Sequence, residues 1–242
     1  MAAGRQHHAD RINCCPQRIR CAKDLLMRVP HFVQKLARDR SGLALVEFGL
    51  ALPLFLGFVL SGIEMANYVM ANNRTQRLTT MAADLVAQSG AGAIGTSEAQ
   101  IYDLFSALDL TAQPFDLRNH GRIVITAVKG TDTNADNVVE SRILWQRFDG
   151  KYVVSPEVGC IQSTSLATLP GNRTLALDEL LFHVQVTYRY QPVFSSAPFR
   201  MFSLPVDFSR HAMFRARSTQ FQTPAADSRF PPKNKCASVT GL

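Results

Sequence analysis

Residues 43–63 read LALVEFGLALPLFLGFVLSGI, an apolar run interrupted by a single charge, Glu47. At about 1.5 Å per residue, a helix of this length extends about 32 Å, which is enough to cross the hydrocarbon core of a bilayer. A cleaved secretory signal has a shorter apolar region followed by a small-x-small site, and residues 66–71 fit such a site poorly. The run therefore predicts a membrane-spanning helix.

The positive charge of the chain is concentrated before this run. Residues 1–42 contain nine Lys or Arg and three Asp, so they carry +6 of the formal net charge of +7. Basic residues that flank a span stay on the cytoplasmic side, so we expect a single-pass protein with a cytoplasmic leader. The sequence offers no basic patch interleaved with aromatic residues, which argues against a nucleic-acid binder.

Within the run, small residues and a proline recur every four positions and so share one helix face. Small residues on one face let another helix approach closely, which predicts a helix-packing face. Glycine and proline are also ordinary in membrane helices, and that alternative stays open. The face consists of Gly49, Pro53, Gly57 and Ser61.

Glu47 has two interpretations on its charge alone. A carboxylate at the centre of a bilayer costs about 2.5–3.5 kcal/mol, so such a residue usually has a partner or a function. Alternatively, a residue one turn inside the span reaches the cytoplasmic headgroups with its side chain.

The residues around Glu47 resemble the processing site of type IV prepilins and pseudopilins. Residues 38–42 read RDRSG, Leu43 begins the apolar run, and Glu47 and Phe48 are its fifth and sixth residues. From 38 to about 90 the sequence resembles the TadE-like proteins of the tight-adherence (Flp-type) pilus apparatus of bacteria. The resemblance implies cleavage between Gly42 and Leu43 by a prepilin peptidase, with Glu47 in the assembly position one turn from the new amino group.

Two features depart from the best-known pilins. The mature chain would begin with Leu43 rather than with Phe, which leaves N-terminal methylation open. The leader is long, and a translation start at Met27 would shorten it to 16 residues and remove Cys14, Cys15 and Cys21.

Beyond the span, residues 64–97 predict a polar extension of the helix followed by a hinge rich in glycine at 88–97. An apolar stripe on the extension predicts packing against a globular domain. Ser97 and Gln100 have the spacing of a capping box, which predicts a second helix. The first stripe is Leu78, Met81, Ala82, Leu85 and Val86, and the stripe of the second helix is Ile101, Leu104, Phe105 and Leu108.

From about residue 114 the period changes to two, which predicts strands. We expect residues 182–190 to have one buried and one solvated face, and 202–208 to form an edge strand that contains Pro205. Residues 223–242 are rich in proline and predict a flexible tail. Further strands are expected at 122–128, at 138–148 and 152–154 around a turn at 149–150, and at 212–217.

The predicted fold is therefore α+β and pilin-like, with a long N-terminal helix followed by a small antiparallel β-rich globular domain. The helix has a transmembrane half and an amphipathic extension. The expected parts are the leader 1–42, the transmembrane helix 43–63, the extension and hinge 64–97, the periplasmic β-rich domain 98–222 and the tail 223–242.

No pattern of an enzyme, a cofactor site or a metal site stands out. The nucleophile elbow, P-loop, zincin and dinucleotide motifs are absent from the sequence, so we predict no catalytic residues and no small-molecule substrate. His7 and His8 lack paired zinc-ligand spacings with the leader cysteines. Cys160 and Cys236 follow the span, and the sequence leaves open whether they pair. His120, His183 and His211 are scattered, and the acidic pairs Asp132/Asp136 and Asp178/Glu179 lie in predicted turns.

The leading functional hypothesis is a minor pseudopilin of the bacterial inner membrane, with its C-terminal domain in the periplasm. It would act in assembly of a Flp-type pilus or a related secretion filament. Its partners would be the bilayer, a prepilin peptidase and other pilus-assembly subunits. The alternative is an unprocessed, signal-anchored periplasmic binding domain or enzyme, in which Glu47 is incidental.

Overall fold

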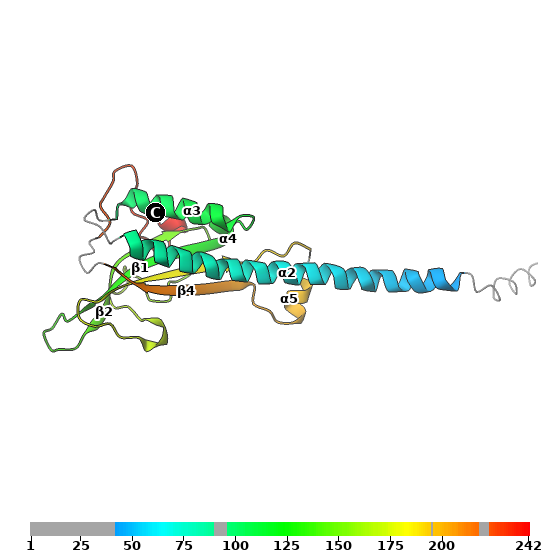
Figure 1. Cartoon of the computed structure of the whole chain (residues 1–242), viewed down its shortest axis with the longest axis horizontal. Helices are drawn as coiled ribbons and strands as arrows, with labels where there is room; N and C mark the ends of the chain where they lie inside the picture. The colour runs from blue at the N-terminus through cyan, green and yellow to red at the C-terminus, as the bar shows by residue number, and fades with distance from the viewer. Residues whose placement is uncertain (1–41, 90–95, 195, 218–222) are drawn as a thin grey trace, which may run out of the picture. The chain divides into compact units, whose positions relative to one another are not determined.

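The computed structural model describes residues 42–89, 96–194, 196–217 and 223–242 (Figure 1). The chain divides into two compact units, the first up to Val59 and the second from Leu60 to Leu242. The predicted leader except Gly42, the alternative start at Met27 and most of the predicted hinge at 88–97 lie outside the described residues.

Helix α2, Leu43–Ser89, is continuous through Pro53. In the first unit all of its residues are exposed, and this exposure continues in the second unit as far as Ile63. From Glu64 onward the helix has a buried stripe and contacts the sheet of the second unit. The predicted division of this helix into an apolar segment followed by an amphipathic one is confirmed.

Helix α3, Glu98–Ala112, begins with the predicted capping box. The Gln100 N–H donates to Ser97 Oγ, and the Ser97 N–H donates to Gln100 Oε1. Of the predicted stripe, Ile101, Phe105 and Leu108 are buried, and Leu104 is partly buried against the same core. A short helix, α4 (Leu117–His120), leads into the sheet, and Asp116 caps its N-terminus.

Four antiparallel strands form one sheet in the order β2-β1-β3-β4. Within the described ranges, further short helices are α5 at Ala197–Met201, η1 at Pro170–Asn172 and η2 at Val239–Gly241. The fold is therefore α+β with a small antiparallel sheet domain after a long apolar helix, as the sequence predicts. The strands are β1 (Gly121–Thr131), β2 (Glu140–Asp149), β3 (Leu180–Arg189) and β4 (Asp207–Arg215).

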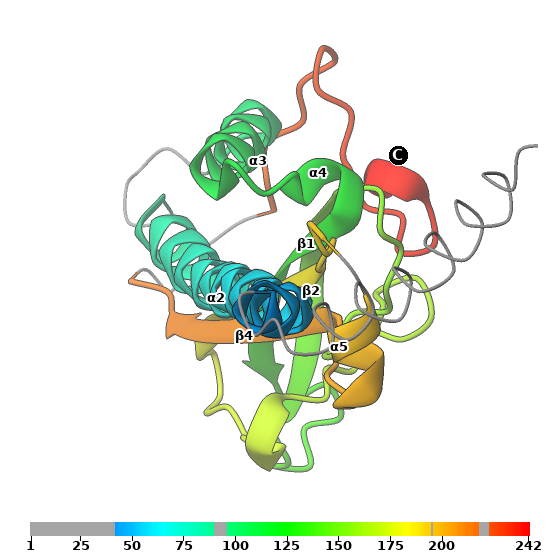
Figure 2. The ribbon, with the colours of Figure 1, turned by 90° about the vertical axis from the view of Figure 1, so that its right-hand side faces the viewer.

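One face of the sheet packs against α2 and α3, which lie on the same side of it (Figure 2). The buried positions of α2 are occupied mainly by alanine and threonine, which allow the helix backbone to lie close to the strands. The Thr75 and Thr79 hydroxyls donate to the carbonyls one turn earlier, so their burial leaves no donor unpaired. Of the predicted stripe, Met81 and Leu85 are exposed, because the face that contacts the sheet includes Ala71, Thr75, Thr79, Ala83 and Ala87.

The prediction that strand β3 has one solvated face is wrong. Every residue from Leu180 to Tyr188 is buried, including His183, Gln185 and Thr187. The second face of the sheet is covered by the segment 150–179, which contributes Val158, Leu169 and Leu175 to a second apolar cluster. Polar side chains on that face are therefore buried against an irregular segment, which leaves no periodic signal in the sequence.

One predicted strand is not formed, and the predicted edge strand at 202–208 begins later than expected. Residues 152–154 are not a strand, and β2 pairs with β1 instead. Gly150 has φ of +105°, and a Cβ there would lie 2.3 Å from the Gly121 carbonyl oxygen, so glycine is required where the chain turns away after β2. Residues 202–206 form a turn after α5, and the edge strand β4 begins only at Asp207.

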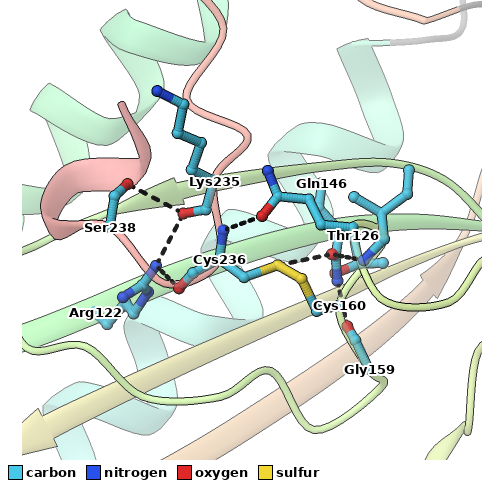
Figure 3. Close-up of a disulfide and its surroundings, with 10 residues drawn as sticks. Arg122, Thr126, Gln146, Gly159, Cys160, Lys235, Cys236 and Ser238 are labelled. Atoms are coloured by element: carbon cyan, nitrogen blue, oxygen red, sulfur yellow. Dashed lines mark hydrogen bonds between the residues drawn. A yellow bond between two sulfur atoms is a disulfide. The ribbon is translucent and has the colours of Figure 1, made fainter.

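The segment 223–242, predicted to be a flexible tail, instead contacts the sheet. Cys236 forms a disulfide with Cys160, and the buried Arg122 guanidinium donates to the carbonyl oxygens of Cys236 and Lys235, at 2.6 Å and 3.5 Å (Figure 3). Lys233 forms an ion pair with Asp149 at the end of β2. Proline lowers the regular secondary structure of this segment, but the covalent bond and these polar contacts fix its position.

Candidate functional site

The first residues of helix α2 form the predicted processing segment. The Val46 N–H donates to the Gly42 carbonyl oxygen at 3.1 Å, so Gly42 accepts the first helical hydrogen bond and Leu43 is the first helical residue. Both residues are exposed, and an added Cβ at Gly42 would meet no atom within 4 Å. The bond between Gly42 and Leu43 therefore lies at the boundary where the helix begins.

Glu47 and Phe48 lie one turn further along the helix, and both are exposed. Residues four apart lie on one helix face with Cβ atoms about 5–6 Å apart, so Glu47 is on the same side as Leu43. Among the described residues, no side chain pairs with Glu47. Its carboxylate is free to neutralise a positive group near the start of the helix or on another chain.

The predicted helix-packing face is uncovered. Gly49, Pro53, Gly57 and Ser61 are all exposed, and an added Cβ at Gly49 or Gly57 would meet no atom within 4 Å. The helix geometry places these residues along one stripe. The structure of the described chain provides no partner for this stripe.

The exposed apolar surface between Leu43 and Ile63 is far larger than a soluble monomer tolerates. In the part of the chain that the structure describes, α2 is the one helix long and apolar enough to cross a membrane. Large side chains provide most of this surface, for example Leu45, Phe48, Leu50 and Phe58. Such a surface requires a lipid or protein environment.

A second carboxylate, Glu64, marks the point where α2 joins the globular core. Its side chain is buried and accepts hydrogen bonds from the Tyr190 hydroxyl at 2.7 Å and from the N–H groups of Val193 and Phe194 at 3.1 Å and 2.9 Å. Burial and then this hydrogen bond to Glu64 raise the pKa of Tyr190, so the hydroxyl remains a donor at physiological pH. Glu64 thus fixes the helix to the loop that follows β3.

An aromatic cluster reinforces this junction one turn later. The Tyr68 ring lies 5.5 Å from that of Tyr190, 5.3 Å from Phe199 and 4.8 Å from Phe208, measured between centroids. The Tyr68 hydroxyl donates to the Pro205 carbonyl at 2.8 Å. Sequence reasoning missed this junction, although an acid and a tyrosine spaced by four residues directly after an apolar run are a usable signal for it.

Two of the three histidines that the sequence suggests are scattered lie together. His183 on β3 and His211 on β4 stack with ring centroids 5.6 Å apart, next to Glu157. Burial, and then His211, lower the pKa of His183 to about 4, so its ring is neutral at pH 7. His120 lies elsewhere, near Asp116. The pairing across β3 and β4 depends on strand register, which one sequence does not reveal.

The acidic pairs lie in turns, as the sequence predicts. Asp132 accepts hydrogen bonds from the N–H groups of Asp136 and Asn137, and all three residues lie between β1 and β2. Asp178 pairs with Lys129, and Glu179 accepts a hydrogen bond from Arg215 at 2.6 Å. These carboxylates hold loops and strand ends together.

Residues 42–84 match the model of a protein family described as TadE-like protein. No curated protein and no solved structure matches the chain in the corresponding comparisons. The matched segment begins at Gly42, includes the whole exposed apolar part of α2, and ends within the part of the helix that contacts the sheet. By this match, residues 42–84 of the chain are similar to the corresponding part of TadE-like proteins.

Proposed function

We propose that this protein is a minor pseudopilin that is processed after Gly42 and acts in assembly of a Flp-type (tight-adherence) pilus or a related secretion filament. The observation that carries the proposal is the TadE-like match at residues 42–84, on a helix that begins at Leu43 and is exposed through Ile63. The match supports a role in Tad/Flp pilus systems, and the geometry of the helix start supports the processing step.

The proposed processing is hydrolysis of the peptide bond between Gly42 and Leu43 by a prepilin peptidase. Water adds across the bond, the leader leaves with a carboxylate at Gly42, and Leu43 gains a free amine that is protonated at neutral pH. Gly42 and Leu43 are both exposed, so the bond between them is accessible to a peptidase. The mature chain would then begin directly with its membrane helix.

Glu47 would neutralise the new ammonium group. An unpaired charge in a low-dielectric setting is far more costly than a paired one, so the amine and a carboxylate one turn away stabilise each other. Glu47 has no other partner among the described residues, so it is available to the amine of its own chain or of a neighbouring subunit. This role explains why an otherwise apolar span retains an acid.

The stripe Gly49, Pro53, Gly57 and Ser61 would be the contact for a second membrane helix. Its residues are small and uncovered, so a neighbouring helix can approach the backbone closely. In this proposal, lateral association between pilus-assembly subunits occurs through this face. The globular domain would provide the contacts outside the membrane.

The proposed orientation places the globular domain in the periplasm. The basic leader favours a cytoplasmic N-terminus. The disulfide between Cys160 and Cys236 supports the same orientation, because disulfides persist in oxidising compartments such as the periplasm and are rare in the cytosol.

Co-expression with a prepilin peptidase tests the processing step. The wild-type chain should lose its leader and give Leu43 as the N-terminal residue, and Gly42→Leu should block this change. Gly62→Leu is the matched control, because an added side chain at Gly62 also meets no atom within 4 Å. If all three proteins keep the same mobility and N-terminus with and without the peptidase, the processing step is wrong.

A further inference from the structure

The sheet face opposite α2 contains a compact group of potential metal ligands. His183 on β3 and His211 on β4 lie on this face as diagonal neighbours, because the register pairs His183 with Met213 and Gln185 with His211. Glu157 reaches them from the segment 150–179, and its N–H donates to the Gln185 side-chain oxygen at 2.7 Å. Three separate segments of the chain therefore converge at this point.

The ligand atoms are close to the spacing that a small cation requires. His211 Nδ1 lies 3.0 Å from Glu157 Oε2, and His183 Nε2 lies 4.0 Å from the same oxygen. All three ligand atoms lie within 4.8 Å of one another. Ligands at about 2.0–2.1 Å in a tetrahedral zinc site lie about 3.3 Å apart, so small side-chain movements bring these atoms to that spacing.

The unpaired ring nitrogens of His183 indicate a bound ion. Its side chain is fully buried, and neither ring nitrogen has a hydrogen-bond partner among the described residues. Buried polar groups are normally satisfied, and an unsatisfied one in a folded protein calls for a specific explanation such as a bound ion. Glu157 and His211 are partly open to solvent, so an ion can enter and water can complete its coordination.

We propose that Glu157, His183 and His211 bind a divalent transition-metal cation of the Zn²⁺ type, with solvent in the remaining position. Two imidazoles and one carboxylate are a ligand set that zinc accepts, and the hard cations Mg²⁺ and Ca²⁺ prefer oxygen ligands. The site joins β3 and the edge strand β4 to the irregular segment that covers them. Its expected role is to hold this segment on the sheet, and it does not depend on the proposed role in pilus assembly.

Zinc titration of the full chain in detergent tests the proposal. The background should carry His7→Ala, His8→Ala, His31→Ala, Cys14→Ser, Cys15→Ser and Cys21→Ser, because these leader residues offer competing ligands. After chelator treatment and removal of any affinity tag, we expect one Zn²⁺ per chain by calorimetry. Bound Co²⁺ should give the visible absorption of a site with nitrogen and oxygen ligands.

Single substitutions test which residues bind the metal ion. Glu157→Gln and His211→Asn should each weaken Zn²⁺ binding at least tenfold, and both residues are exposed, so these variants are expected to fold. His120→Asn is the matched control and should bind like the background. His183→Leu should abolish binding, and its unfolding temperature without metal reports whether the domain still folds.

Thermal unfolding distinguishes a metal site from a simple ion pair between His211 and Glu157. Zn²⁺ at about 100 times its dissociation constant should raise the unfolding temperature of the background by about 5–10 °C. It should have no such effect on the Glu157→Gln protein. Absence of binding, or binding that is equal in the background and in the Glu157→Gln and His211→Asn variants, would overturn the proposal, and so would a thermal shift that Glu157→Gln retains.

Discussion

The two halves of helix α2 differ in the size of their side chains and in what surrounds them. From Leu43 to Ile63 every residue is exposed, and large apolar side chains flank the stripe of Gly49, Pro53, Gly57 and Ser61. From Glu64 onward, the buried positions are mostly alanine and threonine, and the exposed positions include both polar and apolar residues. Small buried residues let the second half of the helix lie close to the sheet, whereas the large apolar side chains of the first half suit the hydrocarbon core of a bilayer.

The largest effect is expected in the half that contacts the sheet. Ala82→Asp places a carboxylate at a position with no exposed surface and should destabilise the globular domain by about 4 kcal/mol or more. The measurement is thermal unfolding and protease resistance of the full chain in detergent.

Met81→Asp is the matched control for this change, because Met81 is the neighbouring residue and is exposed. Its effect should stay below about 1 kcal/mol. Equal loss of stability in the two variants would contradict the assigned helix face.

The same substitution in the apolar half should act on the membrane instead of on folding. Leu54→Asp should cost about 3 kcal/mol of insertion free energy and leave the unfolding temperature of the globular domain unchanged. The measurement is the fraction of protein that resists alkaline extraction from membranes. Leu85→Asp, at an exposed position of the other half, should remain fully membrane-associated.

Substitution of one acidic residue in each half of α2 tests the comparison further. Glu64→Gln replaces the carboxylate that accepts hydrogen bonds from Tyr190, Val193 and Phe194 with an amide, which has one acceptor oxygen instead of two. This change should destabilise the domain by about 2 kcal/mol. Glu47→Gln should leave the unfolding temperature unchanged but abolish pilus assembly at normal protein levels. If Glu64→Gln is neutral in thermal unfolding, Glu64 does not fix the helix to the domain.

The smallest effect is expected outside the helix, at Glu179. A hydrogen bond from Arg215, and then one from the Ala176 N–H, lower the pKa of Glu179 to about 2. A folded-state pKa below the unfolded value of 4.5 means that the contribution to stability is complete above pH 4.5 and is lost as the pH falls towards 2. Glu179→Gln should therefore cost about 0.5–1 kcal/mol at pH 7, because Arg215 is exposed and the pair is screened by solvent.

Denaturant unfolding at several pH values checks this prediction. The difference between wild type and Glu179→Gln should shrink between pH 4.5 and pH 2. A difference that is independent of pH in this range would show that the Glu179 charge is not what stabilises the strand ends.

Local signals predict the helices well. The apolar run at 43–63 identifies the exposed half of α2 without any tertiary information. The capping box at Ser97 and Gln100 predicts the start of α3, because both of its hydrogen bonds are formed within four residues. Period-two alternation locates strands at 122–128, 138–148 and 182–190, although their ends differ by a few residues.

Long-range contacts explain what the sequence does not predict. Strand β3 is buried on both faces because the irregular segment 150–179 covers its second face. The segment 223–242 is fixed by the Cys160–Cys236 disulfide and by the contacts of Arg122 and Lys233. None of these contacts joins neighbours in the sequence, so neither periodicity nor composition reveals them.

The candidate functional residues also differ in whether local sequence or long-range contacts reveal them. Gly42, Leu43 and Glu47 are recognisable because their spacing along the chain is itself the signal. The role of Glu64 depends on hydrogen bonds from a loop more than 120 residues further along the chain. The proximity of His183 and His211 depends on the register of β3 against β4.

The most direct test of the central claim is the intact mass of the protein extracted from the membranes of its native host. The account predicts a chain that begins at Leu43 and contains the disulfide between Cys160 and Cys236. A mass that still includes the residues before Leu43, in cells that assemble the filament normally, would contradict it.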